Sequence, residues 1–101
     1  MNHTDEGTSM PSRIAALRDH GAARLAGYLE VCEDQWENWQ SRANGARLAA
    51  IDPLTIRVYD DEAAYWGRFA EMLRTAIAEV EASERRTARR RTARRPPRAH
   101  N

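Results

Sequence analysis

Apolar and small residues recur at steps of three and four along the first half of the chain. The series comprises Ile14, Leu17, Gly21, Leu25, Tyr28, Cys32, Trp36, Trp39, Ala43, Ala46 and Ala50. This spacing is the period of an amphipathic helix with one buried face, so it predicts a single helix that begins near Pro11. Asn44 and Gly45 form a turn dipeptide, so this helix either ends near residue 43 or continues to Ala50.

The sequence Ile51-Asp52-Pro53 is the clearest break in this pattern. Asp52 is a good N-cap and Pro53 a good first helical residue, so a second helix is predicted to begin there. Residues 54–59 alternate apolar and polar positions, which also fits a short strand. The helical period nevertheless continues from these residues to Val80, and the chain offers no second strand for pairing, so helix is favoured.

Two series spaced by seven residues indicate how the helices pack. They are Leu25, Cys32, Trp39 and Ala46 in the first helix, and Tyr59, Trp66, Leu73 and Val80 in the second. Long helices joined by a tight turn near residues 51–53 pack antiparallel, so the predicted fold is all-α, an antiparallel two-helix hairpin over residues 11–84. Part of each apolar helix face stays exposed in a hairpin. We therefore expect a homo-oligomer, with dimerisation into a bundle. The predicted interface residues are Trp36, Trp39, Trp66, Phe69 and Leu73.

The composition indicates a thin core. Leu, Ile, Val and Phe together account for 14 of the 101 residues, whereas alanine alone accounts for 18. The single cysteine, Cys32, fits a small core residue better than a nucleophile. No apolar run approaches the roughly 18 residues of a membrane span. Residues 1–10 and residues 96–101 are predicted to be disordered. Residues 1–10 also lack the character of a signal peptide, so the expected compartment is the cytoplasm.

Charge is distributed unevenly along the chain. Residues 1–84 carry 8 Arg and 15 acidic residues, whereas the tail, residues 85–101, carries 8 Arg and no acidic residue. The basic residues of the tail are Arg85, Arg86, Arg89, Arg90, Arg91, Arg94, Arg95 and Arg98. Guanidinium groups at this density can neutralise phosphates of a nucleic acid and release counterions. The first hypothesis is therefore a small accessory protein that binds nucleic acid non-specifically through residues 85–98.

The alternative hypothesis is a helical protein–protein interaction or assembly module whose tail contacts an acidic partner. The two hypotheses predict different behaviour, because phosphate binding weakens steeply with salt, whereas a protein contact should fail on Trp39→Ala. One helix face carries a run of acidic residues that either is simply solvated or docks a basic ligand, namely Glu30, Glu33, Asp34 and Glu37.

Catalytic chemistry finds little support in the residues. His3 and His100 lie near the ends of the chain, His20 stands alone, and no pair of His or Cys residues has metal-ligand spacing. There is no glycine-rich loop of the kind that cradles phosphate. We therefore expect a protein that is not an enzyme, has no cofactor and no metal, and does not bind membranes.

Overall fold

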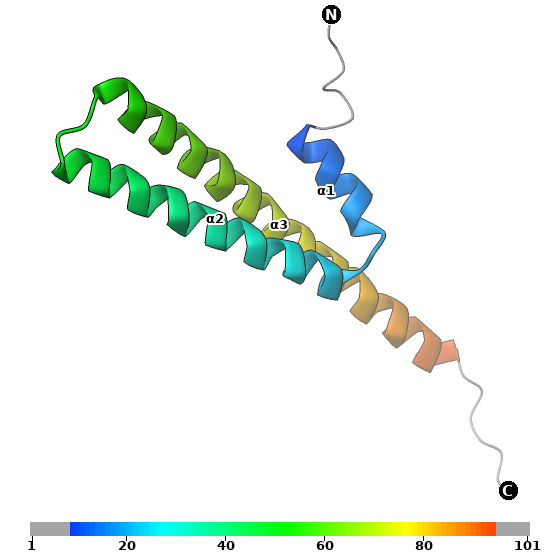
Figure 1. The fold of residues 1–101 in the computed structure, drawn as a ribbon. Coiled ribbons are helices and arrows are strands. Elements are labelled where there is room, and N and C mark those ends of the chain that lie inside the picture. Colours follow the sequence, from blue (N-terminus) through cyan, green and yellow to red (C-terminus); the bar gives the residue numbers. More distant parts are fainter. Residues whose placement is uncertain (1–8, 95–101) are drawn as a thin grey trace, which may run out of the picture.

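The computed structural model describes residues 9–94, which form three α-helices without a strand (Figure 1). The helices are α1 (Met10–Arg18), α2 (Ala22–Leu48) and α3 (Pro53–Arg94). α2 and α3 lie side by side and run antiparallel, and the short α1 packs on the pair (Figure 1). The all-α prediction is confirmed, whereas the two-helix hairpin is corrected because the chain forms three helices. The residues 1–8 and 96–101, for which disorder was predicted, lie outside the described residues. Ser9 and Met10, the last two residues of the predicted leader, form the N-cap and the first residue of α1.

The single first helix predicted from the apolar period is wrong, because the chain breaks at residues 19–21. Gly21 has a φ of +90°, a conformation that residues with a side chain rarely adopt. The amide of His20 donates to the carbonyl of Leu17 and closes α1, and the amide of Leu25 donates to the carbonyl of Gly21 and opens α2. The apolar period passes through this break unchanged, which is why spacing alone predicted a continuous helix.

Gly21→Ala should destabilise the protein by about 1 kcal/mol or more, because alanine at this φ strains the backbone. Space is not the obstacle, since a Cβ at this position would lie 3.8 Å from Oε2 of Glu84, an ordinary contact. Gly27 is the matched control: it lies within α2 with open space around its Cβ position, so Gly27→Ala should stabilise by up to about 1 kcal/mol. Urea unfolding of both variants measures these shifts, and an equally stable Gly21→Ala variant would refute the helix break.

The turn dipeptide at residues 44–45 is helical, and α2 ends beyond it in a Schellman motif. The amide of Ile51 donates to the carbonyl of Ala46 over 3.0 Å, and the amide of Ala50 donates to the carbonyl of Arg47 over 3.1 Å. Ala50 takes the left-handed φ of 55° that this motif requires. The open question from the sequence is thus settled in favour of the longer helix.

Asp52 caps α3 as predicted. Its carboxylate accepts hydrogen bonds from the amide and the hydroxyl of Thr55, at 3.2 and 3.0 Å. Pro53 is the first residue of the helix, where its missing amide proton costs nothing. Residues 54–59 are therefore helical, and the strand alternative is wrong.

The core is small and is concentrated where α1 meets the other two helices. One cluster of buried residues joins the three helices, comprising Ile14, Leu25, Cys32, Phe69, Ala70, Leu73 and Ala76. Towards the α2–α3 turn the buried residues are alanines, at positions 43, 46 and 63. Alanine lets helices approach closely but buries little apolar area, so most hydrophobic stabilisation comes from the cluster beside α1.

α3 extends well past the start of α2 (Figure 1). Its 42 residues span about 63 Å, against about 40 Å for the 27 residues of α2. Because Glu84 lies beside Gly21, the helix that follows Glu84 projects beyond the pair and continues to Arg94. No helix in the described part of the chain is long and apolar enough to cross a membrane.

Candidate functional site

The predicted interface residues lie in different surroundings. Phe69 and Leu73 are buried in the core cluster. Trp66 is half-buried and stacks on Phe69, with ring centroids 6.1 Å apart and planes at 8°. Trp39 is half-buried and Trp36 is exposed. Phe69 and Leu73 therefore serve the chain's own packing, and a shared interface of all five residues stays a prediction.

Trp39 joins α2 to α3 near the turn. Its ring centroid lies 5.7 Å from that of Tyr59, and the guanidinium of Arg42 lies 5.1 Å from the ring in a cation–π contact. Its buried Nε1 has no hydrogen-bond partner among the described residues. Trp39→Ala would thus also remove packing within the chain, which makes it a poor probe of partner binding.

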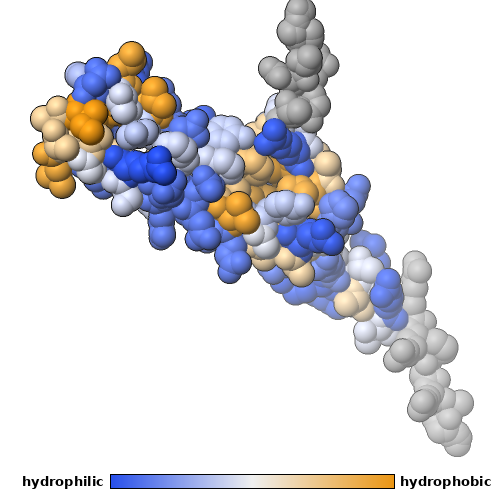
Figure 2. Space-filling view, viewed as in Figure 1, coloured by the Kyte–Doolittle hydropathy of each residue, from blue (hydrophilic) through white to orange (hydrophobic). Residues whose placement is uncertain are grey.

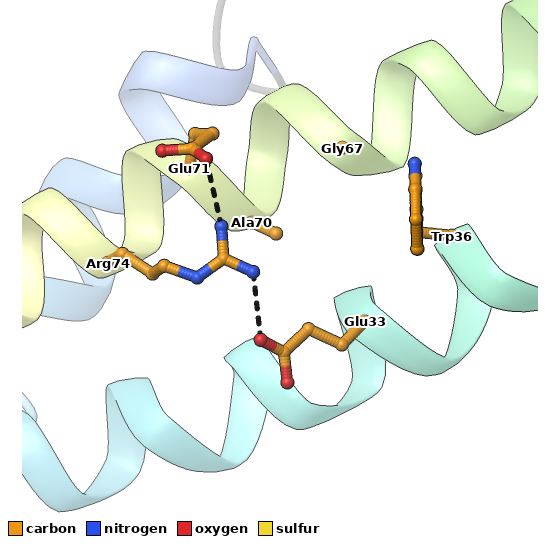
Figure 3. Close-up of a pocket in the computed structure, with 6 residues that line it drawn as sticks. All are labelled: Glu33, Trp36, Gly67, Ala70, Glu71 and Arg74. Atoms are coloured by element: carbon orange, nitrogen blue, oxygen red, sulfur yellow. Dashed lines mark hydrogen bonds and ion pairs between the residues drawn. The ribbon is translucent and has the colours of Figure 1, made fainter.

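A hollow of about 240 Å³ lies between α2 and α3 (Figure 3). Across it the guanidinium of Arg74 contacts Oε2 of Glu33 at 2.9 Å and Oε2 of Glu71 at 3.1 Å. The indole edge of Trp36 lies against Gly67, where a Cβ would come within 3.2 Å of Cδ1. Both ends of the Arg74 guanidinium are bonded, so this hollow offers an anionic ligand no free guanidinium, and the two carboxylates leave it with a net negative charge.

The other members of the predicted acidic face remain solvated. Glu30, Asp34 and Glu37 are exposed and form no ion pair within residues 9–94. Glu33 alone is paired, through Arg74. The face is thus a run of surface carboxylates on α2, of which Asp34 and Glu37 line an open hollow of about 680 Å³.

Most of the predicted nucleic-acid-binding residues that the structure describes share one face of α3. Arg85, Arg86, Arg89, Arg90 and Arg91 are exposed on the projecting end of α3 and form no ion pair with other described residues. A helix turns by about 100° per residue, so Arg85, Arg86, Arg89 and Arg90 fall within an arc of about 140°, and Arg91 lies about 100° beyond it. Arg94 is the last residue of α3, and Arg95 and Arg98 lie outside the described residues.

An apolar groove of about 420 Å³ lies where α1 crosses the α2–α3 pair, and we call it the α1 groove. All three helices line it, with Ser12, Arg13, Ala16 and Leu17 from α1, Tyr28, Val31 and Cys32 from α2, and Trp66 and Phe69 from α3. Tyr28 and Val31 are 41% and 54% exposed despite being large and apolar. The groove can therefore accept apolar side chains of a ligand.

The docking of α1 creates this groove. Ile14 is buried against the other helices, and Arg18 forms an ion pair with Glu79 of α3. At the other end Ser9 caps α1 by accepting a hydrogen bond from the amide of Ser12 over 3.3 Å. These contacts hold α1 in place, so that its residues form one wall of the groove that Val31 also lines.

The charged side chains that line the α1 groove and the hollow beside it are basic. Arg13 lines the groove itself, and Arg24 lines an adjoining hollow of about 160 Å³ beside Tyr28 and Val31. No residue that lines either space is acidic, and neither arginine forms an ion pair within the described part of the chain. The groove thus suits a ligand that is apolar and carries negative charge, although residues 1–84 are acidic overall.

Cys32 contributes to the groove as an apolar group. Burial raises the pKa of its thiol, and the negative charge of Glu33 raises that pKa further. The thiol therefore stays protonated at neutral pH, and a protonated thiol is a poor nucleophile. Among the described residues no group of three or more side chains is placed to hold a metal ion.

A second apolar surface lies at the end of the molecule where α2 passes into α3. Figure 2 shows hydrophobic surface gathered there. It consists of Leu48, Ile51, Leu54 and Val58, of which Leu48 and Leu54 are the most exposed. Large aliphatic side chains this exposed and this close together mark an interaction surface.

Sequence reasoning missed the α1 groove. The apolar pattern assigned Leu17 and Tyr28 to one buried helix face. The signal that points to the groove is Gly21, because a break there frees the segment before it to fold back over α2 and α3.

No curated protein and no solved structure matches this sequence. A family model does match residues 1–80, and its description is TY-Chap C-terminal domain. The matched range includes the α1 groove and the α2–α3 turn, and it ends before the Arg-rich end of α3. With about four fifths of its length matched, the chain belongs to the TY-Chap C-terminal domain family.

Proposed function

We propose that this protein is a chaperone-type interaction module that holds an acidic, apolar segment of a partner protein in the α1 groove. The observation that carries the proposal is the groove itself, an exposed apolar space with arginines at its rim. The family name, which designates a chaperone, supports a protein as the ligand. The proposal involves binding without a catalytic step.

Apolar burial supplies the affinity in this proposal. Covering Tyr28 and Val31 removes apolar area from water, and each Å² contributes about 25 cal/mol before the costs of association. Arg13 and Arg24 supply selectivity, because charges at the rim of an interface mainly steer the approach and exclude partners of the wrong sign. An amphipathic helix with carboxylates beside its apolar face fits both features.

The Arg-rich end of α3 extends this basic surface. Arg24 lies in the first turn of α2, and the start of α2 lies beside Glu84, immediately before the first arginine of the run. A partner with further acidic residues would meet both sets of arginines. The apolar groove within this basic surface favours the acidic-partner hypothesis over nucleic-acid binding, for which the comparisons give no support.

The test uses a synthetic amphipathic peptide with leucines on one face and glutamates on the other, labelled for fluorescence anisotropy. We expect the parent protein to bind it and Val31→Asp to weaken binding at least about ten-fold, because the charge enters the apolar wall. Val58→Asp is the matched control, since Val58 and Val31 are exposed to similar extents, 51% and 54%, on different surfaces. This control should leave the affinity unchanged.

A lysine version of the peptide tests the charge of the rim. It should bind the parent protein at least about ten-fold more weakly than the glutamate version. In Arg13→Glu the affinities for the two peptides should be closer to each other. Equal binding of both peptides, or full affinity in Val31→Asp, would rule out the α1 groove as the site.

A further inference from the structure

The outward face of α3 at the α2–α3 turn carries two aliphatic and two charged residues in helical register. Leu54, Arg57, Val58 and Asp61 follow steps of three, one and three, so they lie on one face of the helix, which we call the tip face. All four are exposed. The buried positions Ala63 and Ala70 lie on the opposite side, against α2. The tip face therefore has no partner within the described chain.

The charged side chains of the tip face are unpaired within the described residues. Arg57 and Asp61 form no ion pair or side-chain hydrogen bond with any described residue. The neighbouring Asp60, by contrast, pairs with Arg47 across the turn. One base and one acid thus stand unpaired on either side of the exposed Val58.

We propose that the tip face binds the tip face of a second copy of this chain. The order of its residues makes it self-complementary: when two such helices meet antiparallel about a two-fold axis near residue 59, Arg57 of each copy faces Asp61 of the other. Val58 of both copies then lies near the axis, and Leu54 of each copy meets the small, exposed Ala64 of the other. A two-fold interface requires this kind of reciprocal match.

The small size of this surface limits the affinity between two copies of the chain. Leu48 and Ile51 adjoin the tip face and are also exposed, so the surface comprises only a few residues per copy, far fewer than the roughly 20–30 per side of a standard interface. The dimer is therefore concentration-dependent. It shares no residue with the lining of the α1 groove, so each dimer offers two grooves and can bind a two-site partner with added avidity.

The experiment is a charge swap followed by mixing, read as mass by sedimentation equilibrium. The parent protein should dimerise as its concentration rises. Arg57→Asp places a second carboxylate against Asp61 of the other copy, and Asp61→Arg places two guanidinium groups together, so each variant alone should be monomeric. An equimolar mixture of the two should dimerise again, because each acidic face then meets a basic one.

Mixing separates contact between copies from effects inside one helix. Arg57 and Asp61 are four residues apart, so each single substitution also changes an interaction within α3, but only a contact between copies is restored by a second protein. Circular dichroism of each variant checks that it is folded. A parent protein that stays monomeric, single variants that stay dimeric, or a mixture that stays monomeric would each overturn the proposal.

Val31→Asp and Val58→Asp distinguish this proposal from the proposed function. Val58→Asp should abolish dimerisation and leave peptide binding intact, and Val31→Asp should do the reverse. Loss of peptide binding in the groove variant therefore says nothing about the dimer, and loss of the dimer says nothing about the groove.

Discussion

Leu73→Asp should leave the protein unfolded at room temperature. Leu73 is fully buried at the centre of the cluster that joins all three helices, and no described basic residue lies within that cluster to pair with a carboxylate. Loss of the leucine side chain alone costs about 2–5 kcal/mol, and burial of an unpaired polar or charged group adds several more. A small domain has a stability of about 5–15 kcal/mol. Five of the ten buried residues in the described core are alanine, which places this protein at the low end.

Far-UV circular dichroism during a thermal melt, at a concentration low enough to keep the chain monomeric, measures the effect. The helical signal should be lost or the cooperative transition should disappear. Leu48→Asp makes the same chemical change at a position that is 90% exposed. Because Leu48 is the last residue of α2, where a carboxylate opposes the helix dipole, this variant should lose at most about 1 kcal/mol and melt cooperatively. Identical melts for Leu73→Asp and the parent would show that the packing register between α2 and α3 is incorrect.

Ile14→Asp should detach α1 while α2 and α3 stay paired. Ile14 is the one buried residue of α1, and the ion pair between Arg18 and Glu79 is exposed, so it contributes at most about 1 kcal/mol. A helix of nine residues is not stable alone in water. The residues of α1 should therefore lose their helical structure, and the α1 groove should lose one wall.

Hydrogen exchange followed by mass spectrometry resolves this change along the chain. Amides of residues 13–18 should exchange as fast as in an unfolded peptide, whereas those in the paired parts of α2 and α3 should stay protected. Ile14→Val is the control, because it keeps an apolar side chain and costs only about 0.5–1.5 kcal/mol. Protected α1 amides in Ile14→Asp would mean that α1 is held by contacts other than Ile14.

The start of α3 and the core-facing positions of α2 and α3 could be predicted because each rests on local information. Asp52 and Pro53 mark the start of α3 whatever the rest of the chain does. The series spaced by seven predicted that Leu25 and Leu73 face the core, and both are fully buried. In the same way, the absence of a possible second strand decided correctly that residues 54–59 are helical.

The break at Gly21 could not be predicted from spacing. A residue in the left-handed region can occupy any position of an apolar stripe without disturbing its period, and Gly27 and Gly45 lie inside α2 in ordinary helical conformation. Nothing in the order of apolar residues distinguishes the three glycines. The difference arises from tertiary packing, because the break lets Ile14 reach the cluster around Leu73.

The candidate site depends on the same packing. Arg13, Val31 and Trp66 meet at the α1 groove although they lie far apart in the sequence on three helices. The high density of arginine in residues 85–98 is a local feature of the sequence, and the first hypothesis about function rested on it. A groove that forms only after α1 folds back leaves no comparable local pattern.

The most direct test of the proposed function is a two-dimensional amide NMR titration of the full chain with the glutamate peptide. We expect the largest chemical-shift changes at residues 12–17, 28–32 and 66–69, which surround the α1 groove, with smaller changes near Arg24. Changes confined to residues 85–94 or to the α2–α3 turn, with none around Val31, would contradict the account and place the partner on a different surface.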